Sequence, residues 1–475
     1  MKEININSKY YLIETMGCQM NERDSETVAG MLENLGYGRV PPCAGGVAEA
    51  RALADVIVVN TCSVRENADN RFFGVLGQIK KAKEQEPSKI VAVCGCMMQQ
   101  EHVVERIRRV FPWVDIVFGT MNIEAFPSLL ADAQAKSDAR GKMIGDARGK
   151  TMSTVRGETV VDVRDSAGPA DSIVEGLPSK REHPHKAFVN IMYGCNNYCT
   201  YCIVPYTRGR ERSREPEAIL DEVRSLAQDG VKEVMLLGQN VNSYCGGGTD
   251  FPALIGLLDE IPGIERLRFM TSHPKDLSDE LVECYRTARR LCPSIHLPIQ
   301  SGSTEVLRRM NRGYAKEDYL ALIDKLRGAN PDIVITTDFI VGFPGETDAD
   351  FAHTMDVIER VRFDSAFTFL YSPRTGTPAA EYEDQVPDDI AHERFERMVN
   401  RLNDITMEKN RRLVGGVYDV LIEGESKTDK ATLSGRTPGG KLVNIRPPEP
   451  GDYVGQILPV RLTEANTFSF LGEFA

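Results

Sequence analysis

The hydrophobic and polar positions of the chain alternate between strand-like and helix-like segments. Residues 9–125 contain three apolar runs, YYLIETMGC, ADVIVVNTC and KIVAVCGC, with helix-like segments between them. In ERDSETVAGMLENLGYG, the side chains of Val28, Met31, Leu32 and Leu35 fall on one helix face, and a glycine follows as a stop. Strands that alternate with helices in this way indicate a parallel sheet with helices on its faces.

Residues 181–410 repeat the alternation more strictly. Six strand-like segments, AFVNIMYG, VKEVMLLGQ, IERLRFMTS, SIHLPIQ, DIVITTDFIVG and DSAFTFLYS, are separated by helix-like ones. Six consecutive units predict a partial (β/α)6 barrel, whose functional residues gather at the carboxyl ends of the strands. Residues 126–180 are rich in Ala, Gly, Lys and Asp and include the strand-like ETVVDV. We interpret them as a connection between domains.

Residues 411–475 change pattern again. The short segments VYDVLIEGES, ATLSGRT, KLVNIRP, YVGQILPVRLTEA and TFSFLGEF are strand-like and separated by turn residues. They predict a small all-β barrel, a shape that often binds nucleic acids. The predicted fold class is therefore multidomain α/β, with an N-terminal parallel α/β domain over 9–125, a partial barrel and a C-terminal β barrel.

Composition limits the functions that the chain can have. Its 475 residues are too many for one ordinary core, and its net charge of −12 does not by itself indicate nucleic-acid binding. Residues 411–475 are neutral, with eight Lys and Arg and eight Asp and Glu. The absence of a signal pattern and of a membrane-length apolar run predicts a cytoplasmic protein with no membrane partner. In such a protein, eleven cysteines favour metal or redox chemistry over disulfides.

Three of these cysteines have a specific spacing. Cys195, Cys199 and Cys202 form a C-x3-C-x2-C motif directly after the first predicted barrel strand. Three thiolates can bind three irons of a [4Fe–4S] cluster and leave the fourth iron open for a substrate or cofactor. The alternative is a zinc site with a distant fourth ligand such as Cys245, although closed zinc sites usually pair two close ligand couples.

A second group of three cysteines follows from the predicted sheet. Cys18, Cys62 and Cys96 each lie at or just beyond the end of a predicted strand. Parallel strands end at one edge of a sheet, so we expect these thiols to share a crevice and to suit another cluster with an open iron. Ordinary buried cysteines are the alternative. Cys94 would share a strand face with Cys96 and remains open as a ligand at this point.

The C-x3-C-x2-C motif after the first strand of a six-unit barrel resembles the radical S-adenosylmethionine (SAM) enzymes. In that family the open iron chelates SAM, and one electron cleaves SAM to a 5′-deoxyadenosyl radical. The whole layout, with a C-terminal barrel of the TRAM type, resembles the methylthiotransferases. The stretches GCQMNERDSE, NTCSVRENA and YCIVPYTRGRERSR look like the MiaB type. This type adds a methylthio group to C2 of N6-isopentenyladenosine (dimethylallyladenosine) in tRNA, next to the anticodon.

The resemblance implies two [4Fe–4S] clusters and two uses of SAM, as methyl donor and as radical source. The context GCMMQ favours Cys96 over Cys94 as a ligand. An electron donor protein and a sulfur or cluster donor are implied partners, and a monomer would suffice. Gln19 and Met20 depart from the sister types that act on a ribosomal-protein aspartate or on threonylcarbamoyladenosine in tRNA. These sister activities, and a non-enzymatic iron–sulfur scaffold, are the alternatives.

Several residues at the predicted strand ends are candidates for SAM contacts: Tyr201, Gln239, Asn240, His296, Gln300, Gly342 and Gly345. Either amide in LLGQN suits the SAM amino group, although a polar turn explains them equally well. His296 and Gln300 share a face if the chain is extended. An interior histidine with satisfied hydrogen bonds is the favoured reading over a catalytic base. The two glycines allow close backbone approach to a ligand.

Two basic segments are candidates for RNA contacts. In RGRERSR, arginines at every second position share one face of an extended chain and suit phosphates: Arg208, Arg210, Arg212 and Arg214. A solvated charged loop is the alternative, since Glu211 dilutes the run. In the C-terminal region, SGRT and KLVNIR resemble RNA-contacting strands of TRAM domains and supply Arg436, Lys441, Asn444 and Arg446. A target base in an RNA loop would have to leave its stack to reach the site.

Overall fold

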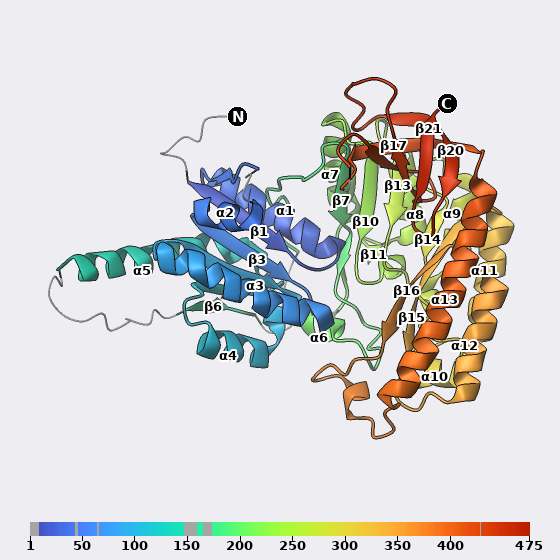
Figure 1. Ribbon diagram of the computed structural model, residues 1–475, viewed down its shortest axis with the longest axis horizontal. Helices are drawn as coiled ribbons and strands as arrows, with labels where there is room; N and C mark the ends of the chain where they lie inside the picture. The colour runs from blue at the N-terminus through green and yellow to red at the C-terminus, as the bar shows by residue number, and fades with distance from the viewer. Residues whose placement is uncertain (1–8, 43–45, 64–65, 147–158, 165–172, 428) are drawn as a thin grey trace. The chain divides into compact units, whose positions relative to one another are not determined.

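The computed structural model describes the chain apart from residues 1–8, 43–45, 64–65, 147–158, 165–172 and 428. The chain divides into two compact units, which we describe separately (Figure 1). The first comprises Met1–Glu182 with Ile203–Glu211, and the second His183–Cys202 with Arg212–Ala475. No described helix is both long and apolar enough to cross a bilayer.

The first unit is built on a parallel six-stranded sheet of order β2-β1-β3-β4-β5-β6. Its strands are β1 (Tyr10–Thr15), β2 (Gly38–Arg39), β3 (Val56–Thr61), β4 (Ile90–Gly95), β5 (Ile116–Phe118) and β6 (Val160–Asp162). Every residue of β3 and β4 is buried, as expected for central strands that helices cover on both faces. The predicted parallel α/β architecture is confirmed.

Helices cover both faces of this sheet (Figure 1). On one face, α1 (Gln19–Asn34) and α5 (Phe126–Asp146) pack with the β3 side chain of Val58. On the other, α3 (Glu66–Gln85) and α4 (Glu101–Val110) pack with that of Val59. The prediction that Leu35 joins the core face of α1 was wrong: it follows the helix and its side chain is 50% exposed.

The segment interpreted as a connection contains two elements of the first unit. Helix α5 buries Phe126, Leu130 and Ala133 against the sheet, and β6 pairs with β5 as an edge strand. The interpretation of these residues as a connection was therefore wrong, because their polar composition hid an apolar stripe at helical spacing. The rest of the predicted connection falls partly on 147–158 and 165–172, outside the described residues.

The second unit begins with six parallel strands in two consecutive sheets. The first sheet has the order β13-β10-β7 and the second β14-β15-β16. A single parallel bridge between Leu267 and Leu291 joins the end of one to the start of the other. The strands are β7 (Lys186–Asn190), β10 (Glu233–Leu237), β13 (Arg266–Phe269), β14 (Ser294–His296), β15 (Val334–Val341) and β16 (Ser365–Leu370). This confirms the predicted partial barrel.

Helices alternate with these strands, and polar side chains fix where several of them begin. The helices are α7 (Pro216–Gln228), α8 (Phe251–Asp259), α9 (Asp279–Thr287), α10 (Thr304–Arg309), α11 (Lys316–Ala329), α12 (Asp348–Val361) and α13 (Asp388–Leu413). Asp250, Ser278, Ser303 and Thr347 each accept a hydrogen bond from a first-turn backbone N–H of α8, α9, α10 and α12, respectively. Such caps satisfy N–H groups that otherwise lack a partner.

The C-terminal strands close into the predicted small barrel, in the order β17-β18-β19-β21-β20. They are β17 (Val417–Glu425), β18 (Leu433–Arg436), β19 (Leu442–Ile445), β20 (Ile457–Ala465) and β21 (Phe470–Phe474). Two buried arginines of β13 join this barrel to the larger one. Arg266 donates to the carbonyl oxygens of Arg436 and Asp419 at 2.9 and 2.7 Å, and Arg268 to that of Thr437 at 2.9 Å.

Candidate metal centres

Three cysteines of the first unit converge where adjacent strands end. Cys18 lies beyond β1, Cys62 follows β3 and Cys96 follows β4, and these strands are neighbours in the sheet. The Cys62 thiol is within hydrogen-bonding range of both other thiols. The structure therefore places all three thiols in one group, at the edge where the strand order predicts a site.

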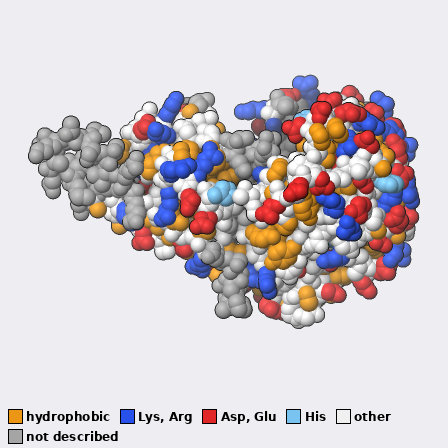
Figure 2. All heavy atoms as spheres, turned by 90° about the horizontal axis from the view of Figure 1, so that it is seen from below, with side chains coloured by type: hydrophobic (Ala, Val, Ile, Leu, Met, Phe, Trp, Pro, Cys, Tyr) orange, Lys and Arg blue, Asp and Glu red, His pale blue; other side chains and the backbone are white. Residues whose placement is uncertain are grey.

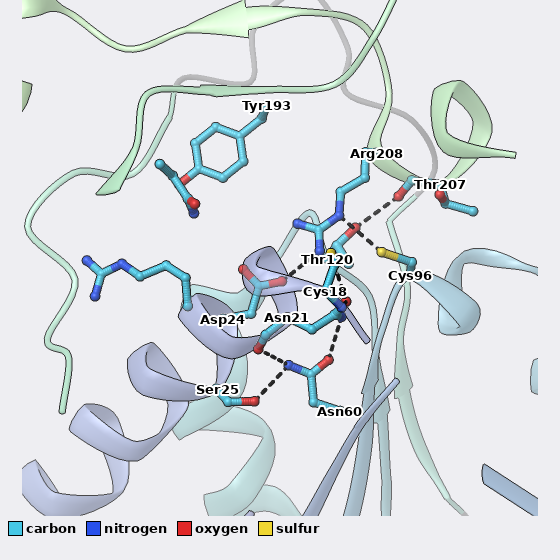
Figure 3. A network of polar contacts seen from close by, with 12 residues as sticks. Cys18, Asn21, Asp24, Ser25, Asn60, Cys96, Thr120, Tyr193, Thr207 and Arg208 are labelled. Atoms are coloured by element: carbon cyan, nitrogen blue, oxygen red, sulfur yellow. Dashed lines mark hydrogen bonds and ion pairs between the residues drawn. The ribbon is translucent and has the colours of Figure 1, made fainter. Parts of the chain in front are cut away.

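A buried amide network fixes Cys18 beside this edge (Figure 3). The Cys18 backbone N–H donates to Oδ1 of Asn21 at 3.3 Å, and Nδ2 of Asn21 donates to Oδ1 of Asn60 at 3.0 Å. In return, Nδ2 of Asn60 donates to the Asn21 carbonyl and to Oγ of Ser25, both at 2.9 Å. The start of α1 is thus tied to the end of β3, which holds Cys18 next to Cys62.

Gly95 turns the chain between Cys94 and Cys96. Its φ is +102°, a conformation that side chains with a Cβ rarely adopt, and Cys96 then begins a 3₁₀ turn, η1 (Cys96–Gln99). The two cysteines therefore do not share a strand face, and that prediction was wrong. Cys94 packs in the apolar core on the α1 side of the sheet, where burial raises the pKa of its thiol. Cys96 is the one that joins the thiol group.

A buried arginine completes the first site (Figure 3). Arg208 ends the short helix α6 (Val204–Arg208), and its side chain is almost fully buried. Its Nε lies 3.1 Å from Sγ of Cys96, and its Nη2 donates to Oδ2 of Asp24 at 2.8 Å. The structure thus contradicts the prediction that Arg208 contacts RNA, because its guanidinium has no access to a phosphate.

The electrostatics of this group favour thiolates at two of its three positions. Contact with the Cys62 thiol is the main cause that lowers the pKa of Cys18 to about 6 and that of Cys96 to about 7, and the Arg208 charge adds to both. The pKa of Cys62 is raised by the same contacts. Cluster ligands bind as thiolates, so this donor set fits an iron–sulfur cluster.

Two hydroxyl groups beside Cys62 support that fit. Oγ1 of Thr61 and Oγ of Ser63 are buried, and no described residue is a hydrogen-bond partner for either. Buried polar atoms in proteins are usually paired, so these two suit a polar group held between the three cysteines.

The second cysteine group lies in the loop after β8 (Met192–Tyr193) of the second unit. Cys199 is buried, whereas Cys195 and Cys202 are partly exposed. The Cys202 N–H donates to the Cys199 carbonyl at 2.9 Å, which closes the loop between them. The motif thus combines one buried cysteine with two that are partly exposed.

Arg312 holds the buried cysteine of this loop. Its Nη1 lies 3.3 Å from Sγ of Cys199, and its Nη2 donates to the Pro298 carbonyl at 2.9 Å. Next to it, Nδ2 of Asn311 donates to the Asn197 and Tyr198 carbonyls, each at 3.1 Å. Sequence reasoning missed Arg312 because nothing local in RMNRGY distinguishes it from a surface arginine.

The proposed alternative zinc ligand, Cys245, is exposed in the short strand β11 (Cys245–Gly246). Among the described residues, no three or more His, Cys, Asp and Glu side chains are arranged to hold a single metal ion. A [4Fe–4S] cluster differs from such a site because each cysteine binds its own iron.

Strand ends of the partial barrel carry buried polar atoms that suit a polar ligand. Oδ1 of Asn190, Oδ1 of Asn240, Oγ of Ser272 and Nε2 of His273 are buried without a hydrogen-bond partner in the described part of the chain. They lie at or beyond the ends of β7, β10 and β13, which are neighbours. SAM carries amino, carboxylate and ribose groups that such atoms can bind. Of the sequence candidates, Asn240 belongs to this set, and Gln239 precedes it in the same turn.

Other SAM candidates have partners within the chain. His296 is buried, with Nδ1 2.9 Å from Oγ1 of Thr336 and Nε2 3.3 Å from Asp338, which supports the interior reading. Gln300 has a φ of +73°, so the chain is not extended there and the expected shared face with His296 is absent. Tyr201 lies in the cysteine loop, with its hydroxyl 3.4 Å from Nη1 of Arg312.

The two glycines predicted to approach a ligand instead approach the chain itself. A Cβ at Gly342 would lie 2.8 Å from Cβ of Ala391, and one at Gly345 would lie 2.6 Å from Asp384. Both have φ above +70°, as such turns require. Their conformational freedom therefore serves packing against α13 and the segment before it.

The arginine run does not form one extended face. Gly209 has a φ of +73° and separates α6 from β9 (Arg212–Ser213), so the predicted alternation was wrong. Arg214 is buried and donates to the Asn190 carbonyl and to Glu222, both at 2.7 Å. Arg210 is exposed and Arg212 partly so.

The residues of the C-terminal barrel that were predicted to contact RNA differ in their exposure to solvent. Nζ of Lys441 donates to the Asp364 carbonyl at 3.1 Å and to Asn410 at 3.0 Å, and burial lowers its pKa, so the structure contradicts its assignment to RNA. Arg436 is 3.3 Å from Glu423 and its side chain is 43% exposed. Arg446 is exposed, and Asn444 is partly so.

Comparison with known families identifies the class. Residues 189–358 match the Radical SAM superfamily, 411–475 the TRAM domain, and 10–119 the Uncharacterized protein family UPF0004. A cobalamin-bound radical SAM methyltransferase, TsrM from Kitasatospora setae, shares the fold, with a TM-score of 0.55 at 15% identity over 78% of this chain and 74% of that one. The chain is thus a radical SAM protein with a TRAM barrel, and this class uses a [4Fe–4S] cluster and SAM.

Two relatives resemble the chain over nearly its whole length, and both are named tRNA-2-methylthio-N(6)-dimethylallyladenosine synthase. The Clostridium botulinum (strain Okra / Type B1) protein is 47% identical over 99% of this chain and 98% of its own. The Acetivibrio thermocellus protein is 48% identical over 98% of this chain and 90% of its own. The chain belongs to the family of tRNA-2-methylthio-N(6)-dimethylallyladenosine synthases.

Proposed function

We propose that this enzyme adds a methylthio group to C2 of N6-isopentenyladenosine in tRNA, next to the anticodon, and that it does so with two [4Fe–4S] clusters. The observation that carries the proposal is the pair of separate three-cysteine groups, each with a buried arginine against one of its sulfurs. Full-length relatives of the same family support the substrate. The names of these relatives give this activity and not a sister activity.

The two cysteine groups have different roles. Cys195, Cys199 and Cys202 hold the cluster that binds SAM, and Arg312 keeps Cys199 in place. With SAM bound, this centre supplies a one-electron route to a carbon that polar chemistry cannot reach, since adenine C2–H is neither acidic nor nucleophilic enough. Asn190, Asn240 and Ser272 bind polar groups of SAM, because their buried atoms have no partner among the described residues.

Cys18, Cys62 and Cys96 would hold the second cluster, whose open iron would supply a binding position for the sulfur that is to be transferred. Two low thiol pKa values allow binding near neutral pH, and the hydroxyls of Thr61 and Ser63 face no described partner. The amide pair of Asn21 and Asn60 keeps Cys18 in register with the other two thiols.

The tRNA is held by a limited number of basic side chains. The net charge is −12, and on the face in Figure 2 Lys and Arg are interspersed with Asp and Glu. Arg210 and Arg446 are exposed and suit phosphates, with Arg212, Arg436 and Asn444 as secondary contacts. The exposed aromatic ring of Phe468, on the C-terminal barrel, suits stacking with a base. The target adenosine leaves its stack to reach the site.

An electron donor protein, and a donor of sulfur or of clusters, complete the cycle. A monomer suffices, because both cysteine groups lie on one chain. A tRNA substrate implies that the enzyme acts in the cytoplasm.

The test uses anaerobically reconstituted protein with SAM, a reductant and tRNA that contains isopentenyladenosine, followed by mass spectrometry of the digested nucleosides. A methylthio gain on that nucleoside is expected, with none on tRNA that lacks the isopentenyl group. SAM cleavage without any gain would refute the substrate.

Iron analysis tests the two centres separately. Cys199→Ala should bind about one cluster less and lose SAM cleavage, and Cys62→Ala should bind one cluster less and keep uncoupled cleavage. Cys284→Ala is the matched control, because Cys284 lies outside both groups and contacts the Pro252 carbonyl. Equal iron in all three variants would contradict the assignment.

A further inference from the structure

We propose that Arg208 and Asp24 form a charge pair that sets the reduction potential of the cluster bound by Cys18, Cys62 and Cys96. This inference rests on the proposed function, because it takes that group to hold a cluster. Arg208 then acts on the reduction potential of this cluster, although it lies in a run of arginines whose sequence is typical of an RNA-binding segment. Its partner Asp24 lies in the first turns of α1.

The contacts of Arg208 are specific. Nε points at Sγ of Cys96 at 3.1 Å, while Nη2 donates to Asp24 at 2.8 Å (Figure 3). The side chain of Arg208 is 4% exposed and that of Asp24 is 13% exposed. The guanidinium therefore uses Nε on the sulfur and Nη2 on the carboxylate, which fixes its orientation.

The backbone around Arg208 is also held in place. Oγ1 of Thr120 donates to the Thr207 carbonyl at 2.9 Å, which ties the end of α6 to the turn after β5. Oγ1 of Thr207 lies 3.4 Å from the carbonyl of Ile203, the residue just before this short helix. These contacts fix the end of α6, and with it the backbone of Arg208, beside the turn after β5.

A buried positive charge against a cysteine sulfur has a defined electrostatic effect. It stabilises whichever state of the centre carries more negative charge, and burial strengthens this effect because water does not screen it. Reduction adds one negative charge to a cluster, so Arg208 raises the reduction potential. Asp24 opposes it, since a carboxylate next to the guanidinium offsets part of its charge.

Two simpler explanations make different predictions. An RNA contact requires an exposed guanidinium, which Arg208 lacks. A purely structural role, in which the arginine only anchors α6, requires no dependence of the reduction potential on its charge. The potential is therefore the measurement that separates tuning from anchoring.

The experiment uses the full chain with Cys195, Cys199 and Cys202 all replaced by Ala, so that only the N-terminal centre binds iron. Into this background we introduce Arg208→Gln, Asp24→Asn or Arg210→Gln. The last is the matched control, because Arg210 is exposed, lies two residues away and loses the same charge. After anaerobic reconstitution, iron and sulfide are quantified, and a redox titration followed by electron paramagnetic resonance gives the midpoint potential.

We expect Arg208→Gln to shift the midpoint to more negative values and Asp24→Asn to more positive ones, with Arg210→Gln unchanged. An unchanged midpoint in Arg208→Gln, or shifts of the same sign in Arg208→Gln and Asp24→Asn, would overturn the inference. If Arg208→Gln binds too little iron to titrate, Asp24→Asn decides alone: a positive shift supports the inference, and no shift or a negative one overturns it. Absence of iron in the background protein would instead refute the second cluster of the proposed function.

Discussion

The turn at Gly95 offers a sharp test of how the first cysteine group is built. Gly95 ends β4 with a φ of +102°, and a Cβ at this position would lie 2.1 Å from the Thr61 carbonyl oxygen. Thr61 ends β3 and immediately precedes Cys62. Gly95→Ala must therefore move either the end of β3 or the start of η1, and each of these carries a cysteine.

The expected cost has two parts. An L-residue in this backbone conformation, with ψ of −176°, costs about 1–3 kcal/mol, and overpacking against a backbone oxygen that cannot rotate away adds about 1–3 kcal/mol. The sum is a loss of about 2–6 kcal/mol in the free energy of unfolding of the first unit. Gly74→Ala is a control of opposite sign. Gly74 lies in α3 with open space around it, so an added methyl group should stabilise the helix by about 0.5–1 kcal/mol.

Urea unfolding of the metal-free protein, followed by tryptophan fluorescence, measures these changes. The sequence contains one tryptophan, Trp113, which packs in the first unit against the α3 side of the sheet. Its signal reports this unit separately from the second. Gly95→Ala should lower the transition midpoint and reduce the iron bound after reconstitution, whereas Gly74→Ala should do neither. Equal midpoints for Gly95→Ala and the parent protein would refute the steric argument.

Three further predictions concern other parts of the chain. Burial raises the pKa of Glu346 from 4.5 to about 7 despite its contacts with Gly342 and Arg394, so the folded state favours the neutral acid. Relative to Glu346→Gln, the free energy of unfolding of the parent protein should fall by up to about 3 kcal/mol as pH rises from about 4.5 through 7. Denaturation followed by circular dichroism at several pH values measures this change. A difference between the two proteins that does not vary with pH would contradict it. Asn60→Ala should cost the first unit about 1–3 kcal/mol, since it removes three buried hydrogen bonds to Asn21 and Ser25; an unchanged Trp113 transition would count against it. Arg446→Gln should weaken tRNA binding and reduce the salt dependence of log Kd by about one unit, whereas Lys441→Gln should leave that slope unchanged because its ammonium group is bound to Asp364 and Asn410. Equal slopes of log Kd against log salt concentration for these two variants would show that solvent exposure of the side chain does not decide which residue contacts tRNA.

The period of the hydrophobic pattern, and the order in which strands and helices follow one another, predicted most of the fold. All five strands of the C-terminal barrel and five of the six in the partial barrel fall within the segments that the apolar pattern marks, and β7 begins one residue before its segment, at Lys186. Helix α5 was missed although Phe126, Leu129, Leu130 and Ala133 have helical spacing, because the polar residues after them dominated the composition. Its partner strand β6 was recognised as strand-like but not placed in a sheet, since three residues contain no information about their neighbour.

The cysteines and their arginines differ in what a sequence can reveal. The positions of Cys18, Cys62 and Cys96 follow from a general rule, that neighbouring parallel strands end at one edge, so their convergence could be inferred from three local patterns. Arg208 and Cys96 are 112 residues apart, and Arg312 and Cys199 are 113 apart. No local pattern connects members of such pairs.

The two arginines nevertheless meet the same physical requirement. A buried thiolate is costly without a positive charge or a hydrogen-bond donor nearby, and each cysteine group has one buried guanidinium that supplies both. They do so with different atoms, Nε from the end of a helix at Cys96 and Nη1 from a turn after a helix at Cys199. A buried thiolate therefore requires a buried positive charge beside it, but the arginine that supplies this charge can lie on different kinds of secondary structure. An arginine in a basic run next to a cysteine motif should accordingly be assigned by its exposure before it is assigned to RNA.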